Sequence, residues 1–94
     1  MSVEERIALA EEALRACHAW HVAEREHIGS FDAKMELCNY SEWLTARFLG
    51  LTEADYVGVP HLGLFPVEIN RATQENAQAL VDEVFERMTA KAPA

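Results

Sequence analysis

The chain has 94 residues, and its 16 acidic residues against 8 basic ones give a formal net charge of −8. Half of the residues are hydrophobic, which excludes a disordered tail, and the acidity argues against nucleic acid and anionic membrane because both repel negative charge. We find no signal-peptide pattern, no membrane-length apolar run and only two cysteines, so we expect one cytoplasmic domain over residues 1–94.

The first predicted helix covers residues 2–27. Ser2 and Glu5 form a capping box, and Gly29 provides a stop followed by Ser30 as a new cap. Its apolar residues fall on two adjacent stripes, an apolar face wider than one partner helix needs. The first stripe is Val3, Ile7, Ala10, Leu14, Cys17, His21 and Ile28, and the second is Leu9, Ala13, Trp20 and His27.

The second predicted helix covers residues 31–49 and ends near Gly50. It also carries two stripes, which predicts a central helix that packs on two sides. The first stripe is Ala33, Leu37, Tyr40, Leu44, Phe48 and Leu51, and the second is Phe31, Met35, Cys38, Thr45 and Leu49.

A short helix over residues 52–57 and an apolar loop over 56–67 come next. The last helix is predicted over 67–89, with Asn70 and Thr73 as rival caps. Its apolar stripe is Ala77, Leu80, Val81, Val84, Phe85 and Met88. No segment alternates with a period of two, so we predict an all-α fold, a compact bundle of three long helices and one short helix.

Two cysteines and a histidine form the densest group of reactive side chains. If the first two helices pair around Gly29, then His21 lies level with Cys38 and Cys17 lies level with Glu42. Such a group suits zinc held by Cys17, His21 and Cys38 with Glu42 or Glu24 as the fourth ligand. It also suits a catalytic Cys17 thiol activated by His21, with Glu24 orienting the imidazole. We favour the third interpretation, that these are ordinary core residues and neither metal nor cofactor is bound.

The run from Leu14 to Gly29 resembles a helix of the carboxymuconolactone decarboxylase and alkylhydroperoxidase-D family. In that family a Cys-x-x-Cys-x-x-x-His run carries thiol chemistry, and Cys17 and His21 match its second Cys and its His. Leu14 stands where the family has its first Cys, which removes the disulfide partner that peroxidase activity needs. The resemblance covers 16 residues of the chain.

The apolar loop over residues 56–67 has two interpretations. We expect it to close one end of the core, because an exposed apolar loop risks aggregation. The alternative is a binding surface for a partner or an apolar small ligand, with Tyr56, His61 and Phe65 as anchors.

The fraction of its surface that a chain of this length can bury predicts a homodimer. A domain of this size buries only about 60–65% of its unfolded surface, and two wide-faced helices need more cover than the rest of the chain provides. We expect the dimer to form through Leu9, Ala13 and Trp20 or through the apolar loop.

As a function we predict an interaction module without catalysis that binds a basic protein partner, with inhibition of that partner as one form that binding could take. The order of two long helices, a short helix and a longer one is similar in outline to the colicin-DNase immunity proteins, which present their short helix to a basic enzyme. That resemblance implies a binding surface around Asp55, Tyr56 and Pro60. The alternatives are a thiol- or zinc-dependent protein and an apolar-ligand binder.

Overall fold

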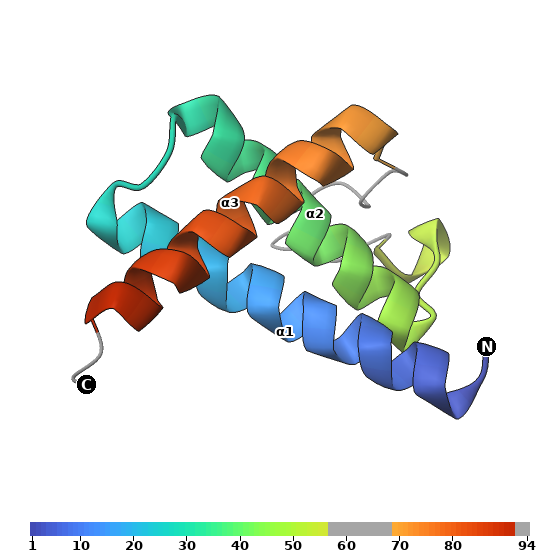
Figure 1. Ribbon diagram of the computed structural model, residues 1–94. Coiled ribbons are helices and arrows are strands. Elements are labelled where there is room, and N and C mark those ends of the chain that lie inside the picture. Colours follow the sequence, from blue (N-terminus) through green and yellow to red (C-terminus); the bar gives the residue numbers. More distant parts are fainter. Residues whose placement is uncertain (57–68, 92–94) are drawn as a thin grey trace.

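The computed structural model describes residues 1–56 and 69–91, and all regular structure in these ranges is helical (Figure 1). The elements are the α-helices α1 (Val3–Glu26), α2 (Phe31–Leu49) and α3 (Arg71–Lys91) and the 3-10 helix η1 (Glu53–Tyr56). The predicted all-α fold is therefore confirmed, although the short predicted helix is a 3-10 helix of four residues. Within the described ranges, no helix has the length and apolar character needed to cross a membrane.

Side-chain caps fix where each α-helix begins. The Ser2 and Ser30 hydroxyls each accept a hydrogen bond, at 3.1 Å, from the backbone N–H three residues further on. The Asn70 side-chain oxygen accepts one from the Thr73 N–H at 2.8 Å. Asn70 is thus the cap of α3, which begins at Arg71 and not at the predicted residue 67.

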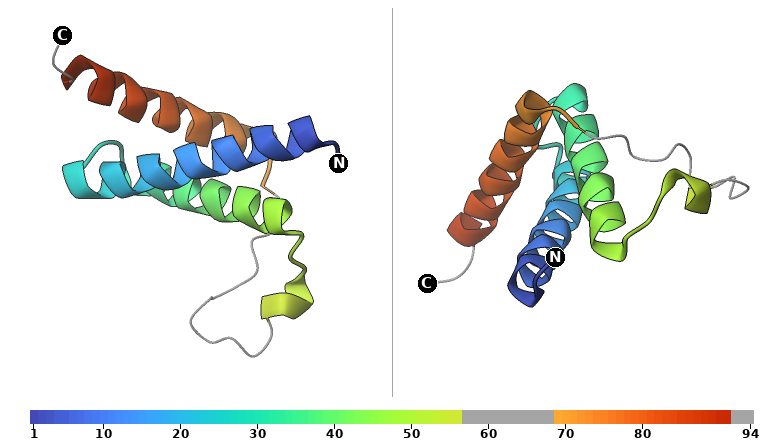
Figure 2. Two further views of the ribbon diagram at one scale, coloured as in Figure 1. Left: turned by 90° about the horizontal axis from the view of Figure 1, so that it is seen from below. Right: turned by 90° about the vertical axis from the view of Figure 1, so that its right-hand side faces the viewer.

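A tight connection of residues 27–30 reverses the chain between α1 and α2. His27, the C-cap of α1, has the left-handed φ of 56°, and the Ile28 N–H continues the turn by donating to the Ala23 carbonyl oxygen at 3.0 Å. Because the connection is short, α1 and α2 pack side by side and antiparallel, and α3 packs against both (Figures 1 and 2).

The core side of α1 consists of small residues. The first predicted stripe of this helix faces solvent, apart from Ile28, whereas the second contributes Ala13 to the core and packs Leu9 and Trp20 against it. Alanine side chains permit close helix approach, so the packing selects the smallest apolar residues of α1 and leaves the larger ones outside. The buried residues of the helix are Ala13, Ala16, Ala19, Val22 and Ala23.

The core stripes predicted for α2 and α3 are confirmed. Every member of the first α2 stripe and of the α3 stripe is buried or partly buried. The largest of these fully buried side chains belong to Leu37, Tyr40, Val81 and Val84. One hydrophobic core therefore joins all three α-helices.

Candidate functional site

The side of α1 and α2 that faces away from α3 carries an unusual amount of exposed apolar surface. We call this side the outer face. Its large exposed members are Leu14 at 71% and Phe31 at 72% of full exposure, together with Val3, Ile7, Met35 and Leu49. The outer face also includes Ala10, Cys17, His21, Cys38, Glu42 and Thr45, which share the same helical stripes.

The outer face corresponds to the first predicted stripe of α1 and the second of α2. The expectation that these stripes enter the core is wrong, except for Ile28, which is buried in the connection after α1. The physical reason is the alanine side of α1: once it has packed against α2 and α3, the opposite side of the helix has no partner within the described residues. For the same reason α2 does not bury its second stripe.

The two exposed stripes meet along the junction between α1 and α2. Lys34 of α2 pairs with Glu24 of α1 at 4.0 Å across this junction. Cys17 is close enough to Cys38 to contribute to raising the pKa of the Cys38 thiol. The stripes on either side of these residues therefore form one surface.

Contacts of α3 lie on the other side of the pair. Arg15 of α1 reaches Asp82 at 3.6 Å, and its guanidinium lies over the Phe85 ring at 4.3 Å. On α2 the Tyr40 hydroxyl accepts a hydrogen bond from Gln78 at 3.1 Å. Neither Arg15 nor Tyr40 belongs to the outer face, so α3 leaves that face uncovered.

Cys38 lies on the outer face and is partly buried. Its S–H donates to the Glu42 carboxylate, with 3.9 Å between sulfur and oxygen. Partial burial and the negative charge of Glu42 raise the pKa of Cys38 above the ordinary cysteine value. A raised pKa reduces the thiolate fraction at neutral pH, so this site disfavours a nucleophilic Cys38.

The residues predicted for thiol or zinc chemistry share the outer face without forming a metal-binding group. Cys17 and His21 are exposed, the His21 ring lies 4.8 Å from the Trp20 ring, and Glu24 is paired with Lys34. Across residues 1–56 and 69–91, no three His, Cys, Asp or Glu side chains are placed so that they could hold a metal ion. The interpretation of Cys17, His21 and Cys38 as interior residues is corrected as well, since none of them is buried.

The surface predicted around the short helix is only partly described. Asp55 is exposed, but its carboxylate accepts hydrogen bonds from the Thr52 N–H at 2.6 Å and from the Thr52 hydroxyl at 3.1 Å. That carboxylate thus holds the turn before η1. The Tyr56 side chain, His61, Phe65 and the apolar loop from residue 57 onward lie outside the described residues.

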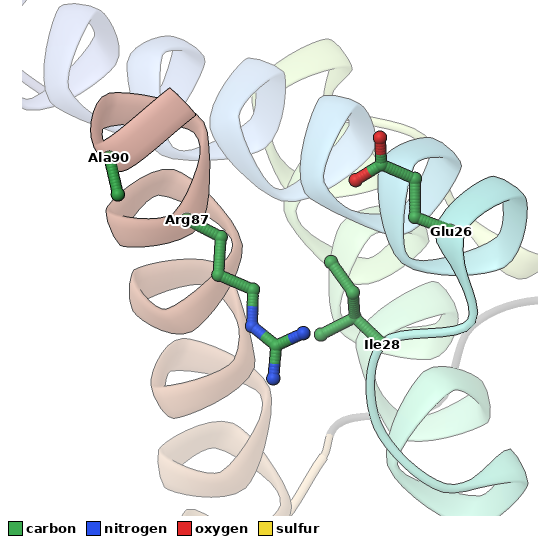
Figure 3. A pocket seen from close by; sticks show the side chains of 4 residues that line it. All are labelled: Glu26, Ile28, Arg87 and Ala90. Carbon is green, nitrogen blue, oxygen red and sulfur yellow. The ribbon is translucent and has the colours of Figure 1, made fainter. Parts of the chain in front are cut away.

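Two shallow pockets lie away from the centre of the outer face. One, of about 260 Å³, is lined by Glu26, Ile28, Arg87 and Ala90, with the Arg87 guanidinium directed towards Ile28 (Figure 3). The other, of about 320 Å³, lies at the far end of the α1 and α2 pair and is lined in part by Met1, Phe48 and Leu49. The first is below, and the second only just above, the volume of about 300 Å³ at which sites that enclose a small molecule begin. The apolar-ligand alternative depends on the loop from residue 57 onward, which lies outside the described residues, so it stays a prediction.

Charges on the outer face nearly balance. On or beside the face, the acidic residues are Glu11, Glu24, Asp32 and Glu42, and the basic residues are Arg6, Arg25 and Lys34. Arg6 lies over the Phe48 ring at 5.0 Å, at the junction of the two helices. Since the whole chain carries −8, most of its excess negative charge lies elsewhere on the molecule.

Comparison with protein-family models, with curated proteins and with solved structures found no match for the chain. The resemblances noted for the Cys17 helix and for the order of the helices gain no support from it. Arguments about function therefore depend on the outer face itself.

Proposed function

We propose that the chain is a protein-interaction module without catalytic activity that binds its partner through the outer face. The observation that carries this proposal is the gathering of Leu14, Phe31 and the other large exposed apolar side chains on one side of the molecule. Soluble monomers rarely expose contiguous apolar patches beyond a few hundred Å², and larger ones mark sites of protein association.

The composition of the face also suits binding better than chemistry. Aliphatic side chains, a phenylalanine and a methionine are typical of the buried centre of protein interfaces. The pKa of the Cys38 thiol on it is raised by its surroundings, in contrast to the lowered pKa of a reactive cysteine. A near balance of charge avoids a strong net repulsion when another surface covers the face.

The proposed face differs from the predicted surface for a basic partner. Asp55 is engaged by Thr52, and the outer face has only a small excess of acidic residues to attract a basic protein. Binding of a basic partner through residues 55–65 stays a prediction. The face supported best by the described residues is apolar.

Site-directed photo-crosslinking tests the proposal. A photo-reactive phenylalanine analogue would be placed at Leu14 or Phe31 and, as matched controls, at Ala72 or Ala79 on the exposed side of α3. After irradiation in cells that natively contain the chain, we expect one crosslinked product of defined mass from the two outer-face positions and none from the controls. Equal crosslinking at all four positions, or none at any, would refute the proposed function.

A further inference from the structure

We propose that the partner of the outer face is a second copy of this chain, so that the protein is a two-fold symmetric homodimer. This inference rests on the proposed function and names its partner. It replaces the dimer surface predicted on α1, because Leu9, Ala13 and Trp20 are used within the chain to pack α1 against its core. The alternative dimer surface, the apolar loop, lies outside the described residues from residue 57 onward.

The size of the face matches what a dimer requires. Each large apolar side chain on it leaves on the order of 100 Å² in contact with water, so the six together expose roughly 600 Å². A stable interface buries about 800 Å² on each partner. Ala10, Cys17, His21 and Thr45, which lie between the large side chains, supply the remainder.

The charges favour self-association on this side over the others. Two chains of charge −8 repel each other, and the repulsion is smallest when surfaces of nearly zero charge meet. On or beside the outer face lie four acidic residues against three basic ones, an excess of one negative charge, and Glu24 is already paired with Lys34 at 4.0 Å. A strongly basic partner would gain little from a surface so close to neutral, whereas a second copy meets only this small excess of like charge.

The geometry of the face allows the same surface to serve both copies. It consists of two antiparallel helices, and two such pairs placed face to face form a four-helix arrangement around a shared apolar core. Leu14 and Phe31 on one copy would then be covered by equivalent apolar positions of the other. A dimer built in this way gives α1 a second core on the side opposite its alanines.

Sedimentation equilibrium of the purified full chain at about 5–200 µM tests the inference, in the range where association of this strength is measured. We expect twice the chain mass of 10.6 kDa for the native protein. Because each replaced side chain is more than two-thirds exposed in the single chain, L14E/F31E should stay folded by circular dichroism and sediment as a monomer.

Two matched variants separate the loss of apolar contact from a change of charge. A72E/A79E adds the same two negative charges on the exposed side of α3 and should leave the dimer intact. L14K/F31K makes the chain less acidic and should still be monomeric, because the lost contact is apolar. If L14E/F31E and A72E/A79E weaken the dimer equally, general charge repulsion is responsible and the assigned interface is wrong.

Failure of the dimer and failure of the proposed function give different results. A native protein that is monomeric at 200 µM, yet crosslinks from Leu14 to another protein in cells, overturns the second copy and keeps the interaction module. A monomer that crosslinks to nothing overturns both. A crosslinked product at twice the chain mass, absent for the control positions, supports both.

Discussion

Two residues that end helices adopt the same left-handed backbone with different side chains. His27 has φ 56° and Gly50 has φ 70°. For a residue with a Cβ this conformation costs roughly 1–2 kcal/mol, and glycine avoids the cost but loses more entropy on folding. The end of α1 is therefore strained, whereas the end of α2 is not.

Replacing each of these two residues should change the free energy of unfolding in opposite directions, upward for His27→Gly and downward for Gly50→Ala. We expect His27→Gly to raise the free energy of unfolding by roughly 0.5–1 kcal/mol, because it relieves the left-handed strain. Gly50→Ala should lower it by about 1 kcal/mol through strain alone, since a Cβ at Gly50 would have no atom within 4 Å. Urea unfolding of both variants checks the pair, and a loss of stability in His27→Gly would show that the imidazole makes a compensating contact.

The Cys38 thiol gives the sharpest test of the thiol alternative. In a Cys17→Ser background, we expect the pH profile of Cys38 modification by a small disulfide reagent to have its midpoint above the ordinary cysteine pKa of about 8.5. The raised pKa means that less thiolate is present at any given pH, so the reaction at pH 7 is slower than that of a short cysteine peptide.

Glu42→Gln in the same background is the control for the cause of this shift. It should move the midpoint down, but not to the peptide value, since burial is the larger cause. A midpoint below 8.5 in the Cys17→Ser protein would instead identify an activated thiol and favour the redox interpretation.

Among the helices, a single buried hydroxyl connects all three. The Tyr40 hydroxyl on α2 donates to the Glu12 carboxylate of α1 and accepts from the Gln78 amide of α3, both at 3.1 Å. Burial is the largest cause that raises the pKa of this phenol. The network therefore fixes how the three helices are oriented around the alanine side of α1.

We expect Tyr40→Phe to cost about 1 kcal/mol of unfolding free energy, a decrease of roughly 4–8 °C in melting temperature. The cost should overlap with that of Gln78→Ala, so a double-mutant cycle should be non-additive. Strict additivity would show that the Tyr40 and Gln78 hydrogen bond does not contribute.

The pH dependence of Tyr40→Phe follows from the sign of the pKa shift. Because the folded state raises the pKa, the neutral phenol stabilises the native protein below about pH 10, and this contribution is lost as the pH rises above that value. Tyr40→Phe should therefore lose less stability than the native protein between pH 9 and pH 11.

At the scale of the whole molecule, the sequence predicted the helices better than it predicted their inner faces. Caps and stops at Ser2, Ser30 and Gly50 are local signals, and the bounds of α1 and α2 followed them closely. Hydrophobic stripes indicate which residues avoid water without indicating which neighbour covers them. On α1 the larger residues outweighed the alanines in that pattern, although close packing buries the alanines.

The candidate surface was visible in the sequence only as an excess of apolar stripes. The first two helices had more apolar stripes than the chain could cover, which led us to expect a dimer. This excess did not identify which stripe stays exposed. Which stripe that is depends on where α3 packs, and this in turn depends on contacts between residues far apart in the chain, such as Arg15 with Asp82 and Tyr40 with Gln78.

The alanine side of α1 has one more consequence, for the evolution of this helix. Ala16 and Ala19 are fully buried, so a larger side chain at either position would push the packed helices apart. Leu14 lies on the opposite, exposed side, so packing within the single chain does not restrict its size. Sequence drift in descendants of this protein should therefore spare its smallest side chains. Any constraint found on its largest ones would reflect selection for assembly, independent of selection for folding.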